Sequence, residues 1–348
     1  MRDLRARRGL TRKAVALASE VSERHLANLE YGTGNASILV LQQVAGALQC
    51  SLAELIGDVT TSSAEWLLLR ELLENRDEAT IQRVRVAVGE LLGIVDTERA
   101  VRMSGSRFAY VLGDGVRVQF ALIQWVMDTV GDSTVLDKII AEHGLKVSNK
   151  PFTPVLPPYM IKTAPYDAMD RLEPREDRYK IEGQDLWLQG SAEHVLGSMH
   201  AGEIFAESDM PVRYLGYATS FRGEAGTYGK DMEGIIRMHQ FDKLEMESFS
   251  TAETSHDEHL LFSGIQEYLM QQLEIPYQKL QKCTFDIGKP NAKGSDIEAW
   301  LPGQSQYRET HTADYMTDYQ SRRLQTRVRR TSGDVELIHT NDATAFAC

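Results

Sequence analysis

Two stretches of the chain combine arginine, carboxylate and aromatic side chains in a pattern that could bind a nucleotide. Residues 221–226 read Phe-Arg-Gly-Glu-Ala-Gly, and residues 234–245 read Gly-Ile-Ile-Arg-Met-His-Gln-Phe-Asp-Lys-Leu-Glu. A guanidinium group is planar, permanently charged and bidentate, so Arg222 and Arg237 suit phosphate oxygens. Neighbouring carboxylates suit Mg²⁺, which prefers oxygen ligands, and Phe241 offers a flat face for a base. Any one of these residues alone would more often be a solvated surface group, so only their order along the chain can indicate a site.

That order resembles the catalytic domain of the class II seryl-tRNA synthetases. Residues 94–108, 155–159, 221–226 and 234–245 follow the succession of the opening segment, motif 1 and motif 2 of that family, and the resemblance covers nearly all of residues 93–347. It implies an α+β fold in which an antiparallel sheet of six or seven strands is flanked by helices. It also implies a symmetric homodimer through motif 1, ATP and Mg²⁺ as cofactors, and serine and tRNA(Ser) as substrates.

The resemblance also assigns roles to individual residues. Arg222 matches the arginine on the α-phosphate of ATP, Arg237 the arginine near the γ-phosphate, and Phe241 the ring that stacks on adenine. The implied ATP-binding set is Arg222, Glu224, Arg237, Met238, Phe241 and Glu309. Within it, Arg222, Arg237 and Glu309 are the expected catalytic residues, and Glu309 is also the expected ligand of Mg²⁺. The implied serine-binding set is Ser191, Glu193, Arg222, Glu245, Thr312 and Thr344.

The last strand resembles the beginning of motif 3 in the same family. Asn341, Thr344 and Ala345 match this strand, and the arginine of the motif would fall just beyond Cys348. That arginine contacts the terminal phosphates of ATP, and the loss of one such clamp can cost orders of magnitude in rate. We therefore expect a C-terminally truncated catalytic domain with impaired activity.

The N-terminal residues follow a different pattern. Thr11 and Ser22 can each cap a following helix, because a hydroxyl can accept a free backbone N–H. Residues 10–16, 21–32 and 41–48 resemble the XRE/Cro-type helix-turn-helix, whose second motif helix enters the major groove. The DNA-binding residues that this implies are Arg24, His25 and Asn28 for bases, and Thr11, Lys13 and Ser22 for phosphates. The alternative is a small helical bundle used for protein contact.

Three regions follow from these patterns: a helix-turn-helix head at 1–57, a helical linker at 58–93, and the synthetase-like domain at 94–348. Head and linker together resemble bacterial regulators that carry a shikimate-kinase-like effector domain. The GxxxxGK[ST] loop of such an effector occurs nowhere in the sequence, so that domain is absent. Residues 1–93 also lack the heptad pair of the long arm with which these synthetases hold tRNA, and weak charging of tRNA is expected.

Composition and charge limit which partners, sites and cellular compartments fit this chain. The chain of 348 residues has a formal net charge of −12, whereas its first 57 residues hold seven Lys or Arg against five acids. A mildly basic head joined to an acidic remainder of the chain suits a local contact with DNA rather than non-specific binding of polyanions by the whole protein. The three scattered cysteines predict neither a zinc site nor a disulfide framework. Without a signal peptide or an apolar run of about 20 residues, we expect a cytoplasmic protein that does not enter a membrane.

Three interpretations of function remain open from the sequence. The first is serine activation by ATP and transfer to tRNA, in intact or damaged form. The second is a DNA-binding regulator whose large domain dimerises or senses a nucleotide or serine. The third is a chimeric or truncated product in which neither activity is at full strength.

Overall fold

The computed structural model describes residues 1–31, 38–48, 50, 55, 88–224, 235–302 and 304–348. The chain forms two compact units, Met1–Arg76 and Asp77–Cys348. Most of the predicted helical linker, residues 58–87, lies outside the described residues.

Four helices make up the described part of the first unit, and they are α1 (Arg2–Arg7), α2 (Arg12–Ser19), α3 (Glu23–Glu30) and α4 (Ile38–Ala47). The two predicted caps are present. The Thr11 hydroxyl accepts the N–H of Ala14 at 3.1 Å, and the Ser22 hydroxyl accepts the N–H of His25 at 3.2 Å. Each cap satisfies one of the unpaired N–H groups at the beginning of a helix. The core beneath them consists of Leu4, Val15, Val21, Leu26, Val44, Ala45, Leu48 and Leu55.

A buried carboxylate connects three of these helices. Glu30 on α3, whose side chain is 2% exposed, contacts Arg5 of α1 at 2.5 Å and Arg12 of α2 at 2.8 Å. The hydrogen bond from Arg5 is the main cause that lowers the pKa of the Glu30 carboxyl. Because a buried carboxylate without its partners would be costly, this group holds the relative positions of α1, α2 and α3.

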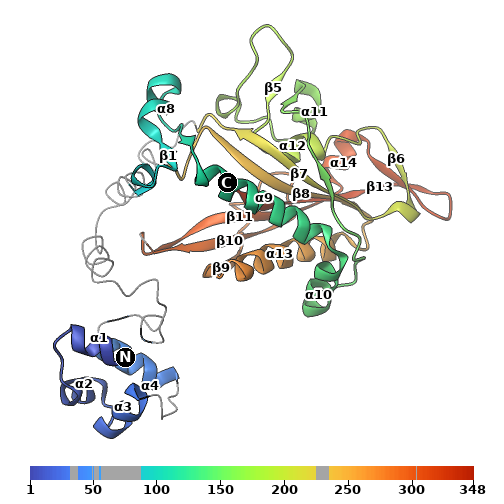
Figure 1. The fold of residues 1–348 in the computed structure, drawn as a ribbon. Coiled ribbons are helices and arrows are strands. Elements are labelled where there is room, and N and C mark those ends of the chain that lie inside the picture. The colour runs from blue at the N-terminus through green and yellow to red at the C-terminus, as the bar shows by residue number, and fades with distance from the viewer. Residues whose placement is uncertain (32–37, 49, 51–54, 56–87, 225–234, 303) are drawn as a thin grey trace. The chain divides into compact units, whose positions relative to one another are not determined.

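The second unit is built on a sheet of seven strands in the order β3-β7-β8-β14-β11-β10-β9 (Figure 1). All neighbours are antiparallel except the edge pair β3 and β7, which is parallel. The predicted antiparallel sheet flanked by helices is therefore confirmed apart from one edge strand. The strand bounds are β3 (Thr153–Val155), β7 (Val212–Phe221), β8 (Gln240–Ser250), β9 (Tyr277–Gln281), β10 (Lys293–Leu301), β11 (Gln306–Thr317) and β14 (His339–Ala347).

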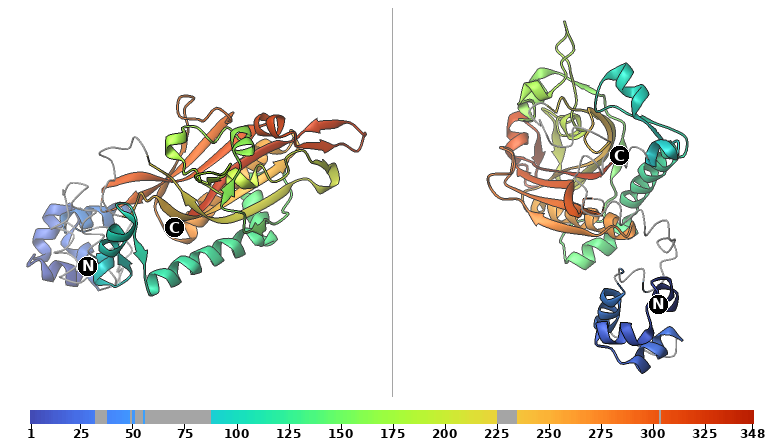
Figure 2. Two further views of the ribbon diagram at one scale, coloured as in Figure 1. Left: turned by 90° about the horizontal axis from the view of Figure 1, so that it is seen from above. Right: turned by 90° about the vertical axis from the view of Figure 1, so that its left-hand side faces the viewer.

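One face of this sheet is apolar because side chains alternate along its central strands. On β8, Leu244 and Met246 point to the core, whereas Lys243, Glu245 and Glu247 occupy the alternate positions. The apolar face is covered by α9 (Asp114–Gly131) and α13 (Ser255–Gln272), which lie along the sheet, and α10 (Ser133–His143) packs on α13 (Figures 1 and 2).

A buried ion pair fixes α13 to strand β7 of the sheet. Arg213 on β7 and Glu258 on α13 are both fully buried, and their side chains meet at 2.6 Å. Arg213 also donates to the carbonyl groups of Ser148 and Lys150 at 2.8 and 2.6 Å. These bonds satisfy the donors of the guanidinium group, which a buried charge requires.

Smaller elements surround the sheet. The remaining helices are α8 (Thr97–Ser104), α11 (Thr163–Ala168), α12 (Glu193–Leu196) and α14 (Tyr319–Leu324), with 3-10 turns η2 (Arg175–Asp177) and η3 (Glu207–Asp209). The short strands are β1 (Val95–Asp96), β2 (Tyr110–Val111), β4 (Met160–Ile161), β5 (Trp187–Leu188), β6 (Ile204–Ala206), β12 (Arg327–Arg329) and β13 (Val335–Leu337). Among the described residues, no helix combines the length and the apolar character needed to span a bilayer.

Candidate active site

Three residues predicted to bind one ligand meet on the polar face of the sheet. The Ser191 hydroxyl lies 3.3 Å from a carboxylate oxygen of Glu193 and 3.3 Å from one of Glu245. Lys243 joins them, with its Nζ 2.6 Å from Glu245 and 3.2 Å from the Ser191 hydroxyl. Two carboxylates and a hydroxyl around one point form a seat for a small cation such as an ammonium group.

The absence of a side chain at Gly216 brings α12 close to the sheet at this seat. Gly216 on β7 lies opposite Glu245 on β8. A Cβ atom at Gly216 would lie 2.6 Å from Leu196 Cδ1 and 3.1 Å from the Cβ of Ala192. Glycine therefore allows the backbone of α12 and its first residue, Glu193, to approach the sheet.

The predicted phosphate-binding residues lie where β7 ends and β8 begins. The guanidinium carbon of Arg222 lies 5.3 Å above the ring of Phe241, and its Nε donates to the carbonyl of Gly190 at 3.1 Å. Glu224 and Arg237 form an ion pair with each other. Met238 follows Arg237 and is half-buried. Phe241 has the same strand parity as Lys243 and Glu245, so these groups belong to the polar face of the sheet.

A β-bulge brings Glu309 to the same face. Thr312 on β11 lies opposite Asp296 on β10, whereas Glu309 lies opposite Glu298, so three steps on β11 correspond to two on β10. Without the extra residue, Glu309 and Thr312 would point to opposite faces. The Thr312 hydroxyl instead contacts both acids, at 2.7 Å from Asp296 and 3.2 Å from Glu309.

The last predicted residue, Thr344 on β14, lies directly opposite Glu245 and is buried. Its backbone carbonyl accepts a hydrogen bond from Gln266 of α13 at 2.8 Å. The predicted residues thus lie around one sheet face and its rim, although the contacts form three separate groups. These groups are Ser191–Glu193–Glu245, Arg222–Phe241 with Glu224–Arg237 on the adjoining segments, and Glu309–Thr312.

Sequence reasoning missed five charged residues of this face: Arg171, Lys243, Glu247, Asp314 and Asp342. Arg171 contacts Glu193 at 2.9 Å, Asp342 at 3.3 Å and Asp314 at 3.7 Å. Period-two alternation could have found Lys243 and Glu247, which flank Glu245, and Asp342, which precedes Thr344. Arg171 follows α11 in an irregular segment and has no such signal.

The carboxyl groups differ strongly in electrostatic environment. Burial would raise the pKa of Glu193, but the charge of Arg171 outweighs it and holds that pKa well below its usual range. Burial raises the pKa of Glu245 to about 7, although Lys243 opposes the shift. The pKa values of Glu247 and Asp342 are raised well above the ordinary range by burial and by neighbouring carboxylates. Burial and the charge of Asp296 also raise the pKa of Glu309.

Oxygens of Glu193, Glu245 and Asp342 lie within 4.8 Å of one another, which is close enough to share a metal ion. Arg171 and Lys243 already contact these acids, and Arg171 bridges Glu193 and Asp342. Charge neutralisation by protein cations therefore accounts for much of the cluster without a metal.

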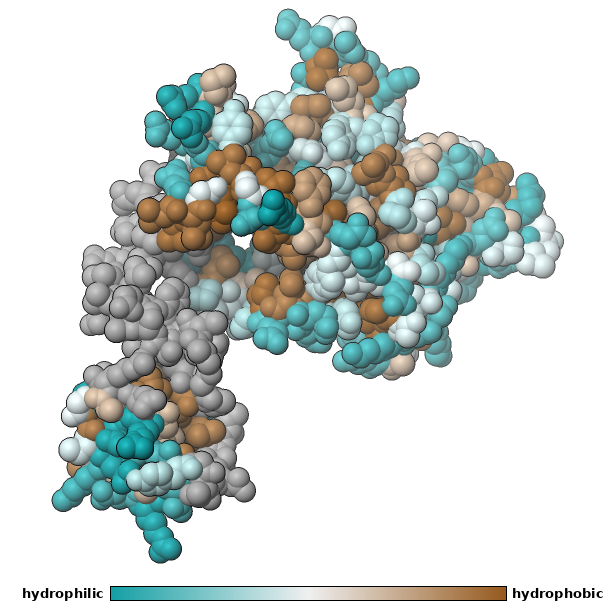
Figure 3. All heavy atoms as spheres, viewed as in Figure 1, coloured by the Kyte–Doolittle hydropathy of each residue, from teal (hydrophilic) through white to brown (hydrophobic). Residues whose placement is uncertain are grey.

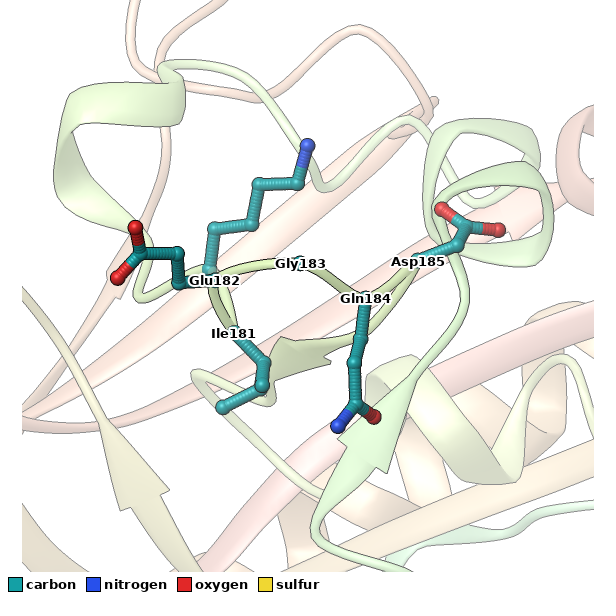
Figure 4. A pocket seen from close by; sticks show the side chains of 6 residues that line it. Ile181, Glu182, Gly183, Gln184 and Asp185 are labelled. Atoms are coloured by element: carbon teal, nitrogen blue, oxygen red, sulfur yellow. The ribbon is translucent and has the colours of Figure 1, made fainter.

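A separate hollow of 530 Å³ lies at the hairpin turn formed by residues 180–185. In Figure 4 its side chains spread in different directions, and none converges on a common point. Asp185 is held by Thr163 at the start of α11. This hollow is the concave side of a turn and lacks the polar convergence of the sheet face.

Comparison with known proteins agrees with this architecture. Residues 177–348 match the family described as tRNA synthetase class II core domain (G, H, P, S and T), and residues 1–55 match a helix-turn-helix family. A seryl-tRNA synthetase from Pyrococcus horikoshii, solved with ATP, is 32% identical and superposes with a TM-score of 0.67, over 99% of this chain and 81% of that one. The chain belongs to the class II tRNA synthetase family. Its predicted resemblance to seryl-tRNA synthetases, behind a helix-turn-helix head, is confirmed.

Two further relatives show what share of a serine–tRNA ligase this class II synthetase homologue covers. A serine–tRNA ligase from Pyrococcus furiosus is 42% identical over 267 residues, which are 76% of this chain and 55% of that protein. A cytoplasmic serine–tRNA ligase from Naegleria fowleri, solved with AMP, is 29% identical with a TM-score of 0.65, over 75% of this chain and 53% of that one. The chain thus spans about half the length of the curated relatives it matches.

The raised pKa of Glu245 makes the stability of this synthetase homologue depend on pH. The pKa of Glu245 is about 7 in the folded protein, whereas the ordinary pKa of a glutamate is 4.5. The protonated carboxyl group therefore contributes its full stabilisation below pH 4.5, and this contribution is lost as the pH rises through 7. Glu245→Gln cannot lose a proton. We expect its free energy of unfolding, relative to the unmodified protein, to rise by about 2 kcal/mol between pH 5 and pH 7.5.

Urea unfolding followed by tryptophan fluorescence at both pH values measures this difference. Glu142→Gln, which removes an exposed carboxylate on α10, is the control and should show no such rise. A difference between Glu245→Gln and the unmodified protein that stays constant with pH would contradict the raised pKa.

Proposed function

We propose that the second unit activates serine with ATP to form seryl-adenylate and pyrophosphate. A serine carboxylate oxygen would attack the α-phosphorus, and the bond from that phosphorus to the oxygen bridging to the β-phosphate would break. The observation that carries the proposal is the seat formed by Ser191, Glu193 and Glu245 beside the arginine-bearing rim. This arrangement can hold an ammonium group while guanidinium charge faces the reacting phosphate.

The geometry supports a division of roles. Glu193, Glu245 and Ser191 would receive the serine ammonium, with Thr344 opposite Glu245 on β14 and Thr312 one strand further on β11. Arg222 would bridge the serine carboxylate and the α-phosphate. Phe241 would stack on adenine with Glu224 and Met238 at its edge, and Arg237 would leave Glu224 to reach the γ-phosphate.

The donor set around Glu309 fits Mg²⁺. Glu309 and Asp296 present carboxylate oxygens on adjacent strands, and the Thr312 hydroxyl holds both. Burial raises the pKa of each carboxyl, a shift that a bound divalent cation would reverse. When bound, the ion would neutralise charge on the phosphates of ATP. Transfer of the seryl group to tRNA is the second step that we propose, since the named relatives are serine–tRNA ligases.

Serine-dependent exchange of pyrophosphate into ATP tests this function. We expect exchange with serine that exceeds exchange with alanine. Arg222→Ala should lower its rate by about 100-fold, because a donor to developing charge is lost. Arg322→Ala, at an exposed position that pairs with Asp318, is the control and should retain the rate.

Folded protein that shows no serine-dependent exchange would refute the proposal. The same preparation, given tRNA and labelled serine, would test the second step separately.

We further propose that the second unit forms a homodimer. Apolar side chains are exposed along β2 and the start of α9, namely Tyr110, Val111, Leu112, Val118 and Phe120, each with 38–59% of its surface exposed (Figure 3). Contiguous exposed apolar groups of this kind mark interaction sites. Sedimentation velocity should show a dimer that Phe120→Glu dissociates and that Leu17→Glu, at an exposed site in the head, leaves intact. A monomer at every concentration would contradict this pairing.

We also propose a second function, carried by the head, which is binding to duplex DNA. The match of residues 1–55 to a helix-turn-helix family favours it, as do the observed caps of α2 and α3. Arg24 and Asn28 are exposed on α3 beside the half-buried His25, so these three are proposed to face the bases. Thr11, Lys13 and Ser22 are exposed at the starts of α2 and α3 and are proposed to contact phosphates.

A gel shift with a random-sequence duplex over a range of salt concentrations tests this binding. We expect affinity to fall with salt, and Lys13→Ala should reduce the slope of log affinity against log salt by about 1. Arg102→Ala, on α8 of the second unit, is the control and should leave the slope unchanged. Absence of a shift at low salt would refute DNA binding by the head.

A further inference from the structure

The acidic surface around the amino-acid seat extends beyond the residues that serine needs. Glu247 follows Glu245 by two residues on β8, and Asp342 precedes Thr344 by two residues on the antiparallel strand β14. Glu247 and Asp342 therefore lie opposite each other on the same face. Asp314 on β11 lies opposite Asp342 in turn. Three carboxyl groups on three neighbouring strands therefore form an extension of the seat.

Glu247 is the member of this extension that forms neither a hydrogen bond nor an ion pair with any described residue. It is 0% exposed, and within the part of the chain that the structure describes neither of its carboxyl oxygens has a hydrogen-bond partner. The groups that act most strongly on its charge are Asp342, Glu193 and Glu245, which places it at the same cluster. A buried carboxyl group without a partner is costly and is a place where a ligand donor would be favourable.

Three described cations contact this acidic cluster but leave Glu247 without an ion pair. Arg171, Lys243 and Lys282 contact the cluster at 2.9, 2.6 and 3.2 Å from Glu193, Glu245 and Asp314 respectively. Lys282 also lies 3.5 Å from Asp296. Among the described residues, these three cations form ion pairs with Glu193, Glu245, Asp314 and Asp342, whereas none of them forms an ion pair with Glu247.

We propose that this seat also binds a small diamino acid, of which 2,3-diaminopropionate is the simplest, with the second ammonium received by Glu247 and Asp342. The inference rests on the proposed amino-acid site. The two ammonium groups of this compound lie on adjacent carbons, and the oxygens of Glu193, Glu245 and Asp342 lie within 4.8 Å of one another. Two adjacent ammonium groups can therefore share one cluster of acceptors.

A divalent metal ion fits the same cluster less well. Such an ion needs carboxylate oxygens for itself, whereas Arg171 and Lys243 already occupy Glu193 and Glu245. Ammonium groups donate single hydrogen bonds and can use oxygens that an arginine or lysine also contacts.

Isothermal titration of the full chain with 2,3-diaminopropionate, serine and alanine tests the inference. We expect 2,3-diaminopropionate to bind at least tenfold more tightly than alanine. Glu247→Gln keeps the shape of the side chain and should reduce the preference for 2,3-diaminopropionate over serine on the order of tenfold. Asp342→Asn should act in the same direction, which provides a second measurement if one variant is poorly folded.

Glu182→Gln, at an exposed position of the hairpin turn, is the matched control and should keep the preference. Binding of serine without binding of 2,3-diaminopropionate would overturn this inference while the proposed function stands. Binding of neither amino acid would refute the proposed function as well. Heat released on titration of Mn²⁺ and abolished by Glu247→Gln, with no response to 2,3-diaminopropionate, would replace the diamino acid with a metal.

Discussion

Arg171 is the charge that allows a carboxylate-rich sheet face to exist in the interior of the second unit. Its guanidinium group contacts acids from three separate elements, Glu193 on α12, Asp342 on β14 and Asp314 on β11. Buried carboxylates repel one another strongly in a medium of low polarity, and an unpaired one is among the most costly groups in a fold. The approach of α12 to the sheet therefore depends on this cation as well as on the glycine beneath it.

The geometry of the strands places the polar groups together on one face, where they can form a site. Alternation along β8 separates Leu244 and Met246 from Glu245 and Glu247, so one strand serves both the core and the polar face. The bulge in β11 then places Glu309 with Thr312 although their spacing in sequence would set them apart. The apolar face contributes stability and the other face contributes chemistry, and neither can shift register without exposing the wrong side chains.

Site residues that belong to motifs in a fixed order could be predicted from the sequence. Residues that are brought to the site only by tertiary contacts could not. Ser191, Glu193 and Glu245 were predicted as one set because the motifs keep their order, and the structure brings them together. Arg171 could not be predicted, since an irregular segment carries no periodic signal and its partners are distant in sequence. The parallel pairing of β3 was also missed, because strand direction at a sheet edge depends on the path of the chain between elements.

The carboxylate of Glu30 has a consequence for the charge of the head. It forms ion pairs with both Arg5 and Arg12, so two of the seven basic side chains in residues 1–57 face inward to an acid rather than outward. Replacement of Glu30 by a neutral residue would increase the positive potential at the surface and would loosen the three helices that this carboxylate joins. Attraction for polyanions and rigidity of the head are therefore opposed through one side chain, and a change that improves the first weakens the second.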